Sequence, residues 1–211
     1  RILEGRLPVQ NERFRIIYAD NPLQYLVSFA TADLMRADHQ IIMPTRKGNY
    51  GTQRINPALQ IRFNGRGVSL QLDRYDDKEP PLTVRSDDKF LWTKNDYALN
   101  MFNGEIGTVE WVSKEEGDLS LLTPDRQIHV PARVKTYSAY HQTTISYDPR
   151  KNIELGYAVT THKAQGSEFN TIIYCITGGQ AFLLNRQNFY TAITRAKHQV
   201  IMICDRRAMG L

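Results

Sequence analysis

Cysteine is scarce in this sequence of 211 residues, which contains only Cys175 and Cys204. Each lies in an apolar, strand-like run, so we predict two buried core thiols. Two cysteines so placed supply neither a disulfide framework nor the ligand spacing of a metal site. We therefore expect a reducing, intracellular compartment, the cytoplasm.

Long hydrophobic runs are also missing. No stretch approaches the length that crosses a bilayer, and no signal-peptide pattern opens the sequence, so we expect no membrane partner. There is no internal repeat and no low-complexity tract. A composition of 41% hydrophobic and 23% charged residues is ordinary for a globular protein of one domain, or of one domain with a small insert.

A phosphate-binding loop is the third absence. The sequence has no Gly-x-x-x-x-Gly-Lys-Ser/Thr before a helix and no acidic run of the kind that holds Mg²⁺ after a strand. By itself the chain is therefore expected to fold but not to hydrolyse ATP. Its formal charge of +5 permits a polyanionic partner, although many soluble proteins are mildly basic.

One polar stretch follows directly on an apolar one. Residues 157–161 are predicted to form a buried strand, and a Gly166-Ser167 corner leads to another at residues 171–176. Open α/β sheets bind ligands where buried strands end, and glycine lets the backbone approach a phosphate closely. The pattern indicates a ligand-binding turn.

A second stretch has helical spacing. Phe189, Ala192, Ile193 and Ala196 form one apolar face, and Arg195 lies off that face. A strand at residues 199–204 is predicted to follow.

These residues resemble a known family. The first stretch is similar to motif V of superfamily 1 helicases, in the form AVTxHKxQGSE, and the second to motif VI, in the form YTAxTRAK. The nearest likeness is to the RecD-like helicases of the 5′-to-3′ branch. Residues 44–60, after a predicted strand at 40–43, resemble their motif IV, PxRKGxxGxxxxNxxLQ. The resemblance covers residues 14–205.

The resemblance implies an α/β fold, a RecA-like parallel sheet flanked by helices. Strands are expected near residues 14, 41, 157, 172 and 200, and the second motor domain is expected to comprise residues 1–92 and 151–211. Short alternating strands and turn signals such as Asn103-Gly104 predict a small barrel between them. By resemblance this is an SH3-like β-barrel inserted at residues 93–150, with the chain back in the main sheet near 152–157.

Two helices are expected before the barrel. One begins at Pro22, and Leu23, Leu26, Val27, Ala30 and Leu34 give it an apolar face. The other starts either at Thr52, with Pro57 inside it, or at Pro57, with Asn56 as its cap. The sequence leaves both starts open.

The resemblance also assigns roles. Arg195 would be the arginine finger that reaches the γ-phosphate, where a guanidinium neutralises transition-state charge. Gln165 would link nucleic-acid binding to catalysis. The nucleotide contacts would come from Arg46, Lys47, Gly166, Ser167 and Glu168. For Arg195 the plainer interpretation is a surface ion pair, and for Arg46 and Lys47 a solvated pair of cations on a loop.

Thr160, Thr161 and His162 would meet the DNA backbone, since hydroxyl side chains commonly bind phosphate and sugar. The plainer alternatives are an ordinary strand threonine for Thr160 and a helix-capping or core histidine for His162. Aromatic residues of the expected barrel could stack on bases or fill its core. Burial is favoured for Trp111 and Phe102, and no site is placed there.

The chain thus resembles the C-terminal motor half of an ATP-dependent DNA helicase. ATP and Mg²⁺ would be the cofactors of the full-length enzyme. The partners would be single-stranded DNA, the first RecA-like domain of the same polypeptide, and other recombination or repair subunits. An RNA helicase half and a non-catalytic nucleic-acid-binding module are the alternatives.

Overall fold

The computed structural model describes residues 12–29, 38–76, 79–138, 140, 142–183 and 185–210. It divides into two compact units. The first unit joins Arg1–Phe63 to Tyr157–Leu211, and the second is Asn64–Gly156. The second unit therefore starts well before residue 93, where the insert was expected.

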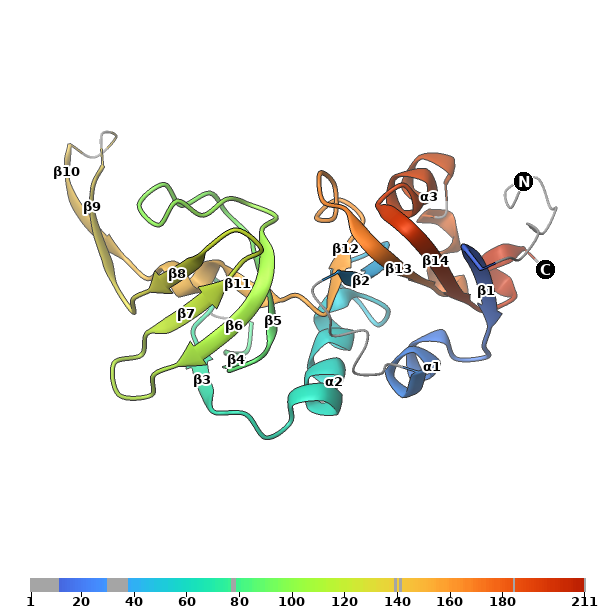
Figure 1. Cartoon of the computed structure of the whole chain (residues 1–211), viewed down its shortest axis with the longest axis horizontal. Coiled ribbons are helices and arrows are strands. Elements are labelled where there is room, and N and C mark those ends of the chain that lie inside the picture. Colours follow the sequence, from blue (N-terminus) through green and yellow to red (C-terminus); the bar gives the residue numbers. More distant parts are fainter. Residues whose placement is uncertain are drawn as a thin grey trace. The chain divides into compact units, whose positions relative to one another are not determined.

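The first unit is built on a five-stranded parallel sheet in the order β1-β14-β13-β2-β12 (Figure 1). The strands are β1 (Phe14–Tyr18), β2 (His39–Met43), β12 (Ala158–Thr160), β13 (Phe169–Ile176) and β14 (Ala196–Cys204). All five expected strands are confirmed. The central strand β13 is buried from Thr171 to Ile176, which fits its nearly continuous apolar run.

In the part of the chain that the structure describes, three α-helices cover this sheet: α1 (Pro22–Phe29), α2 (Thr52–Asn64) and α3 (Arg186–Ile193). In Figure 1, α1 and α2 lie on one face and α3 lies on the other. Ala30 and Leu34, expected in the first helix, lie outside the described residues. Ala196, expected on the third helix, is the first residue of β14, so the helix ends before Arg195.

The structure decides between the two starts of α2, because the helix begins at Thr52 and contains Pro57. Asn56 is not a cap. Its side-chain amide donates to the carbonyl of Ala158 (3.0 Å) and its Oδ1 accepts from the amide of Ala158 (2.7 Å). A side chain thus pairs with the backbone of the edge strand β12.

The second unit contains a five-stranded sheet and two separate hairpins. The sheet order is β11-β5-β6-β7-β8, all antiparallel, with strands β5 (Lys89–Trp92), β6 (Ile106–Val112), β7 (Leu119–Leu122), β8 (Gln127–Val130) and β11 (Ile153–Leu155). The hairpins are β3 (Ser69–Leu72) with β4 (Leu82–Arg85), and β9 (Val134–Ser138) with β10 (Thr143–Tyr147). The return to the main sheet was expected near residue 152, but β11 still belongs to the second unit.

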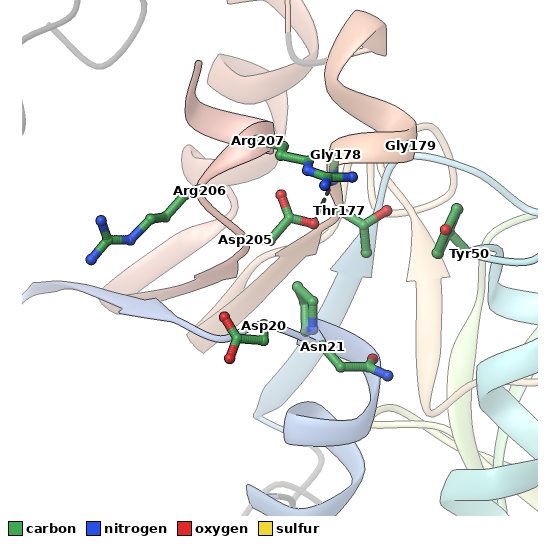
Figure 2. A pocket seen from close by; sticks show the side chains of 10 residues that line it. Asp20, Asn21, Tyr50, Thr177, Gly178, Gly179, Asp205, Arg206 and Arg207 are labelled. Carbon is green, nitrogen blue, oxygen red and sulfur yellow. Dashed lines mark hydrogen bonds between the residues drawn. The ribbon is translucent and has the colours of Figure 1, made fainter. Parts of the chain in front are cut away.

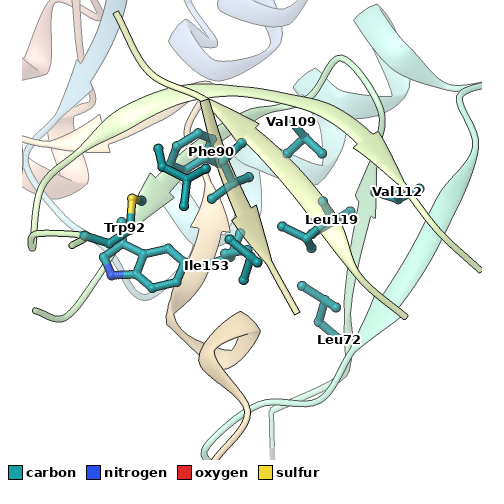
Figure 3. Close-up of a cluster of buried hydrophobic side chains, with 12 residues drawn as sticks. Leu72, Phe90, Trp92, Val109, Val112, Leu119 and Ile153 are labelled. Carbon is teal, nitrogen blue, oxygen red and sulfur yellow. The ribbon is translucent and has the colours of Figure 1, made fainter. Parts of the chain in front are cut away.

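Figure 3 shows the core of the second unit, where Phe90, Trp92, Leu119 and Ile153 pack together. Leu72, from the hairpin before residue 93, belongs to the same cluster. This explains the early boundary, because the hairpin buries its apolar side chains in this unit.

The exposed aromatic residues differ from expectation. Trp111 is 38% exposed and Phe102 is 42% exposed, so neither is a core residue. Among the described residues there are also three short 3₁₀ helices, Pro149–Asn152, Gly178–Leu183 and Arg207–Met209. None of the helices in the described ranges combines the length and apolarity needed to cross a membrane.

Candidate functional site

The turn between β12 and β13 contains the predicted ligand-binding residues. It runs from the carboxyl edge of the sheet, where β12 ends, to the amino edge, where β13 begins. The amide of Thr161 still bonds to the carbonyl of Met43 (3.1 Å), beyond which the chain turns and re-enters the sheet at Phe169. Gly166 has a φ of +92°, and no atom lies within 4 Å of the place a Cβ would take. Glycine is therefore required there by the backbone conformation and not by crowding.

Arg195 lies between the end of α3 and the start of β14. Its carbonyl accepts from the amide of Phe169 (2.8 Å). Its guanidinium donates through Nε to the carbonyl of Thr191 (3.2 Å), through Nη1 to that of Ser167 (3.5 Å) and through Nη2 to Oγ1 of Thr194 (3.2 Å). The structure thus brings Arg195 together with the Gly166-Ser167 corner.

All three acceptors of the Arg195 guanidinium are uncharged oxygens. In the described part of the chain no carboxylate forms an ion pair with it. Its positive charge is therefore oriented by two backbone carbonyls and one hydroxyl but is not neutralised, which suits an anionic ligand.

Glu168 and Lys197 flank this corner and form an ion pair at 3.4 Å. Their side chains are 62% and 51% exposed, so solvent screens the pair and its stabilisation is small. Gln165 is exposed on the same turn. The side chains of Glu168 and Gln165 can therefore reorient toward a ligand at little cost in free energy.

Arg46 and Lys47 lie at the other edge of the sheet. Their loop follows the carboxyl end of β2 and is fixed by Nε2 of Gln180, which donates to Oγ1 of Thr45 (2.6 Å). Arg195 precedes the amino end of β14, a strand parallel to β2 through β13. The eight residues of β13 separate the two edges by about 23 Å. The expected grouping of Arg46 and Lys47 with Arg195 is therefore not formed within this unit.

Thr160, Thr161 and His162 lie at the same carboxyl edge as Arg46. Thr161 is 2% exposed, and its hydroxyl donates to Oδ1 of Asn188 at 3.0 Å. Oγ1 of Thr160 lies 3.3 Å from the amide of Lys163, from which it accepts. His162 is exposed. Thr161 thus ties the strand end to α3, and His162 presents its ring to solvent.

Two residues of this edge were missed by sequence reasoning. Asn188 also accepts from the hydroxyl of Tyr174 (3.1 Å), so it joins β13, α3 and the turn after β12. It lies in the stretch that resembles motif VI, which was a usable signal. Gln180 has no such signal, because only the fold brings it to Thr45.

Comparison with known proteins adds three kinds of likeness. The UvrD-like helicase C-terminal domain family matches residues 155–203, which include the turn, α3 and most of β14. The ATP-dependent RecD2 DNA helicase of Deinococcus radiodurans is 32% identical over 158 residues, 75% of this chain and 19% of that protein. The RecBCD enzyme subunit RecD of Buchnera aphidicola is 28% identical over 167 residues, 77% of this chain and 24% of that protein.

Solved structures show the same fold at low sequence identity. Pif1 from Bacteroides bound to single-stranded DNA aligns with a TM-score of 0.54 at 17% identity, covering 86% of this chain and 47% of that one. Pif1 from Candida albicans aligns with a TM-score of 0.50 at 14% identity, covering 89% and 53%. The chain spans about a fifth to a quarter of the two sequence relatives.

Proposed function

The chain belongs to the RecD-like superfamily 1 helicases and corresponds to their C-terminal part, and we propose that it is the second motor domain of an ATP-dependent DNA helicase. In this proposal the two edges of its parallel sheet have different ligands. The amino edge at Arg195 meets the nucleotide, and the carboxyl edge at Arg46 and His162 meets the DNA strand.

At the amino edge, Arg195 is proposed as the arginine finger. Gly166, Ser167 and Glu168 would contact the nucleotide, and Gln165 would couple it to the DNA. The phosphate-binding loop and the carboxylate for Mg²⁺ would come from a first RecA-like domain, because this sequence has neither motif. A guanidinium held at the cleft stabilises the charge that spreads over the γ-phosphoryl oxygens.

At the carboxyl edge, Thr160 and His162 would bind the sugar-phosphate backbone, and buried Thr161 would hold the strand end in place. We propose that Arg46 and Lys47 contact the same DNA strand. They follow β2, which is the neighbour of β12 in the sheet, and therefore lie at the same carboxyl edge. The proposal also includes single-stranded DNA as the ligand, 5′-to-3′ movement, and recombination or repair subunits as partners. A further part is that residues 93–150, within the second unit, form an SH3-like β-barrel.

The observation that carries the proposal is the guanidinium of Arg195, which is oriented by three uncharged oxygens beside the Gly166-Ser167 corner. In the complete helicase, Arg195→Ala should lower kcat for ATP by about a thousandfold or more. Arg195→Lys should restore little, because an ammonium cannot reproduce the planar fork. Steady-state ATPase assays on saturating single-stranded DNA measure both.

Lys197→Ala is the matched control, because it removes a cation two residues away whose exposed ion pair contributes little. Its kcat should stay within about threefold of wild type. DNA affinity without nucleotide and the melting temperature should change little in Arg195→Ala. A large loss of melting temperature with a nearly normal kcat would instead make Arg195 a structural residue.

A further inference from the structure

A pocket of about 760 Å³ opens at the carboxyl edge of the first unit's sheet (Figure 2). Segments that follow β1, β2, β13 and β14 line it, and none of the lining residues was assigned to the site described above. The lining residues are Asp20, Asn21, Pro22, Tyr50, Thr177, Gly178, Gly179, Asp205, Arg206 and Arg207. Its volume is in the range of small-molecule sites.

The sheet topology favours a ligand here. From β2 the chain runs through α2 and the second unit to the edge strand β12, whereas from β13 it runs through α3 to β14 on the opposite side. Neighbouring strands whose connections leave in opposite directions form a switch point, and open α/β sheets bind ligands outside the carboxyl ends of such strands. The pocket lies beside this point.

Two consecutive glycines frame the pocket. A Cβ on Gly178 would lie 2.7 Å from Cβ of Arg207, and one on Gly179 would lie 2.5 Å from Cε2 of Tyr50. Neither glycine has a positive φ, so space and not backbone conformation requires them. Arg207 and the ring of Tyr50 are thus held against the backbone of one dipeptide.

Among the charged residues that line the pocket, Arg207 is a cation that can bind an anionic ligand. Both oxygens of Asp205 accept from backbone amides, those of Gly178 (2.7 Å) and Ala208 (2.7 Å). Asp20 is exposed at the rim. Within the described ranges no carboxylate forms an ion pair with Arg207. Figure 2 shows Arg207 reaching over Thr177, while Arg206 points away from Tyr50.

We propose that this pocket takes one nucleotide unit of the DNA strand, with its phosphate on Arg207 and its base on the ring of Tyr50. Tyr50 is 42% exposed, so part of its side chain is accessible to a base. Nε2 of Gln180 donates both to Oγ1 of Thr45 (2.6 Å) and to the carbonyl of Tyr50 (3.0 Å). These hydrogen bonds hold Tyr50 in the same loop as Arg46, at the carboxyl edge of the sheet. The inference rests on the proposed function, in which the strand follows this edge.

The test uses the chain itself and a fluorescent oligothymidylate of about ten nucleotides. Arg207→Gln should weaken binding by about tenfold and lower the slope of log affinity against log salt by about one. Tyr50→Leu should weaken binding by about tenfold with the slope unchanged, because stacking releases no counterion. Arg62→Gln, at the exposed last turn of α2, removes the same charge and should change neither quantity by more than about twofold. Melting temperatures check that each variant is folded.

The outcomes separate this inference from the proposed function. If the wild-type chain binds the oligonucleotide and Arg207→Gln and Tyr50→Leu both behave like Arg62→Gln, the pocket is not part of the track, although the proposed function stands. If the wild-type chain binds no oligonucleotide, the proposed function fails and the inference fails with it. Thymidine monophosphate is the second probe. Affinity for it equal to that for the oligonucleotide, and dependent on Arg207, would show that free nucleotide is the ligand and overturn the assignment to the strand.

Discussion

The neighbours of each side chain decide what single residues of the first unit can do. Arg195 and Lys197 are cations of the same short stretch, yet their contacts differ. Carbonyl and hydroxyl oxygens orient Arg195, whereas an exposed carboxylate pairs with Lys197. Only the first arrangement presents an oriented, uncompensated charge to a ligand.

Gly166 allows a prediction about the backbone alone. Its φ of +92° disfavours any side chain, although the space around it is open. Gly166→Ala should lower the free energy of unfolding by about 1 kcal/mol, and Gly166→Asn by less, because asparagine tolerates positive φ better. Urea denaturation measures both. An alanine variant as stable as the wild type would show that the turn relaxes to a negative φ.

The buried thiols predict a pH dependence of stability. Burial raises the pKa of Cys204 to about 12 and raises that of Cys175 above its ordinary value of 9.0. The pKa values of both thiols are higher in the folded protein than in the unfolded chain. The two protonated thiols therefore contribute fully to the free energy of unfolding below about pH 9, and this stabilisation is lost as the pH rises toward the folded-state pKa values. The free energy of unfolding should therefore fall above pH 9.

A variant with Cys175→Ala and Cys204→Ala tests this interpretation. Its stability is expected to be lower at neutral pH, because the substitutions leave cavities, but its decline with alkaline pH should be shallower. Burial also raises the pKa of Tyr174, so some decline should remain. An identical decline in wild type and variant would assign the effect to other groups.

At the scale of elements, α2 protects the open edge of the sheet. β12 is an edge strand, and such a strand offers unpaired backbone groups to other chains. The amide side chain of Asn56 occupies both groups of Ala158, which is 1% exposed. The helix is thus joined to the strand by a side chain that imitates a neighbouring strand.

Asn56→Leu should therefore lower the free energy of unfolding by about 3 kcal/mol, since it leaves a buried amide and a buried carbonyl unpaired. Arg62→Leu on the exposed last turn of the same helix is the control and should cost less than about 0.5 kcal/mol. Chemical denaturation provides the comparison. Equal stabilities of the two variants would mean that water hydrogen-bonds to the backbone of Ala158 in place of the Asn56 side chain, with no loss of stability.

At the scale of the whole molecule, the chain consists of two compact units with separate cores. Both tryptophans, Trp92 and Trp111, belong to the second unit, and both cysteines belong to the first. Tryptophan fluorescence therefore reports on the second unit and thiol accessibility on the first. The two probes can be read in the same sample.

We expect the two units to unfold in separate transitions, because two-state unfolding is a property of single domains. In a urea titration the midpoint from tryptophan fluorescence should differ from the midpoint of thiol labelling. Asn56→Leu should move the thiol midpoint and leave the fluorescence midpoint in place. Coincident midpoints that move together would show that the units unfold as one.

The sequence by itself determined the elements whose signal is local. Apolar runs predicted all five strands of the parallel sheet, and the Gly166 corner and the apolar face of α3 were visible as short patterns. The multi-residue motifs were sufficient to indicate the helicase family. These features depend on a few neighbouring residues, which is why a pattern of period two or 3.6 can reveal them.

Only the tertiary structure decided which of these elements lie together. It moved the boundary of the second unit to Asn64, because the hairpin of β3 and β4 buries its side chains there. It separated Arg46 from Arg195, and it joined Tyr50 and Arg207 around one pair of glycines. The order of parallel strands follows from long crossover connections, and no local pattern encodes which strands become neighbours in the sheet.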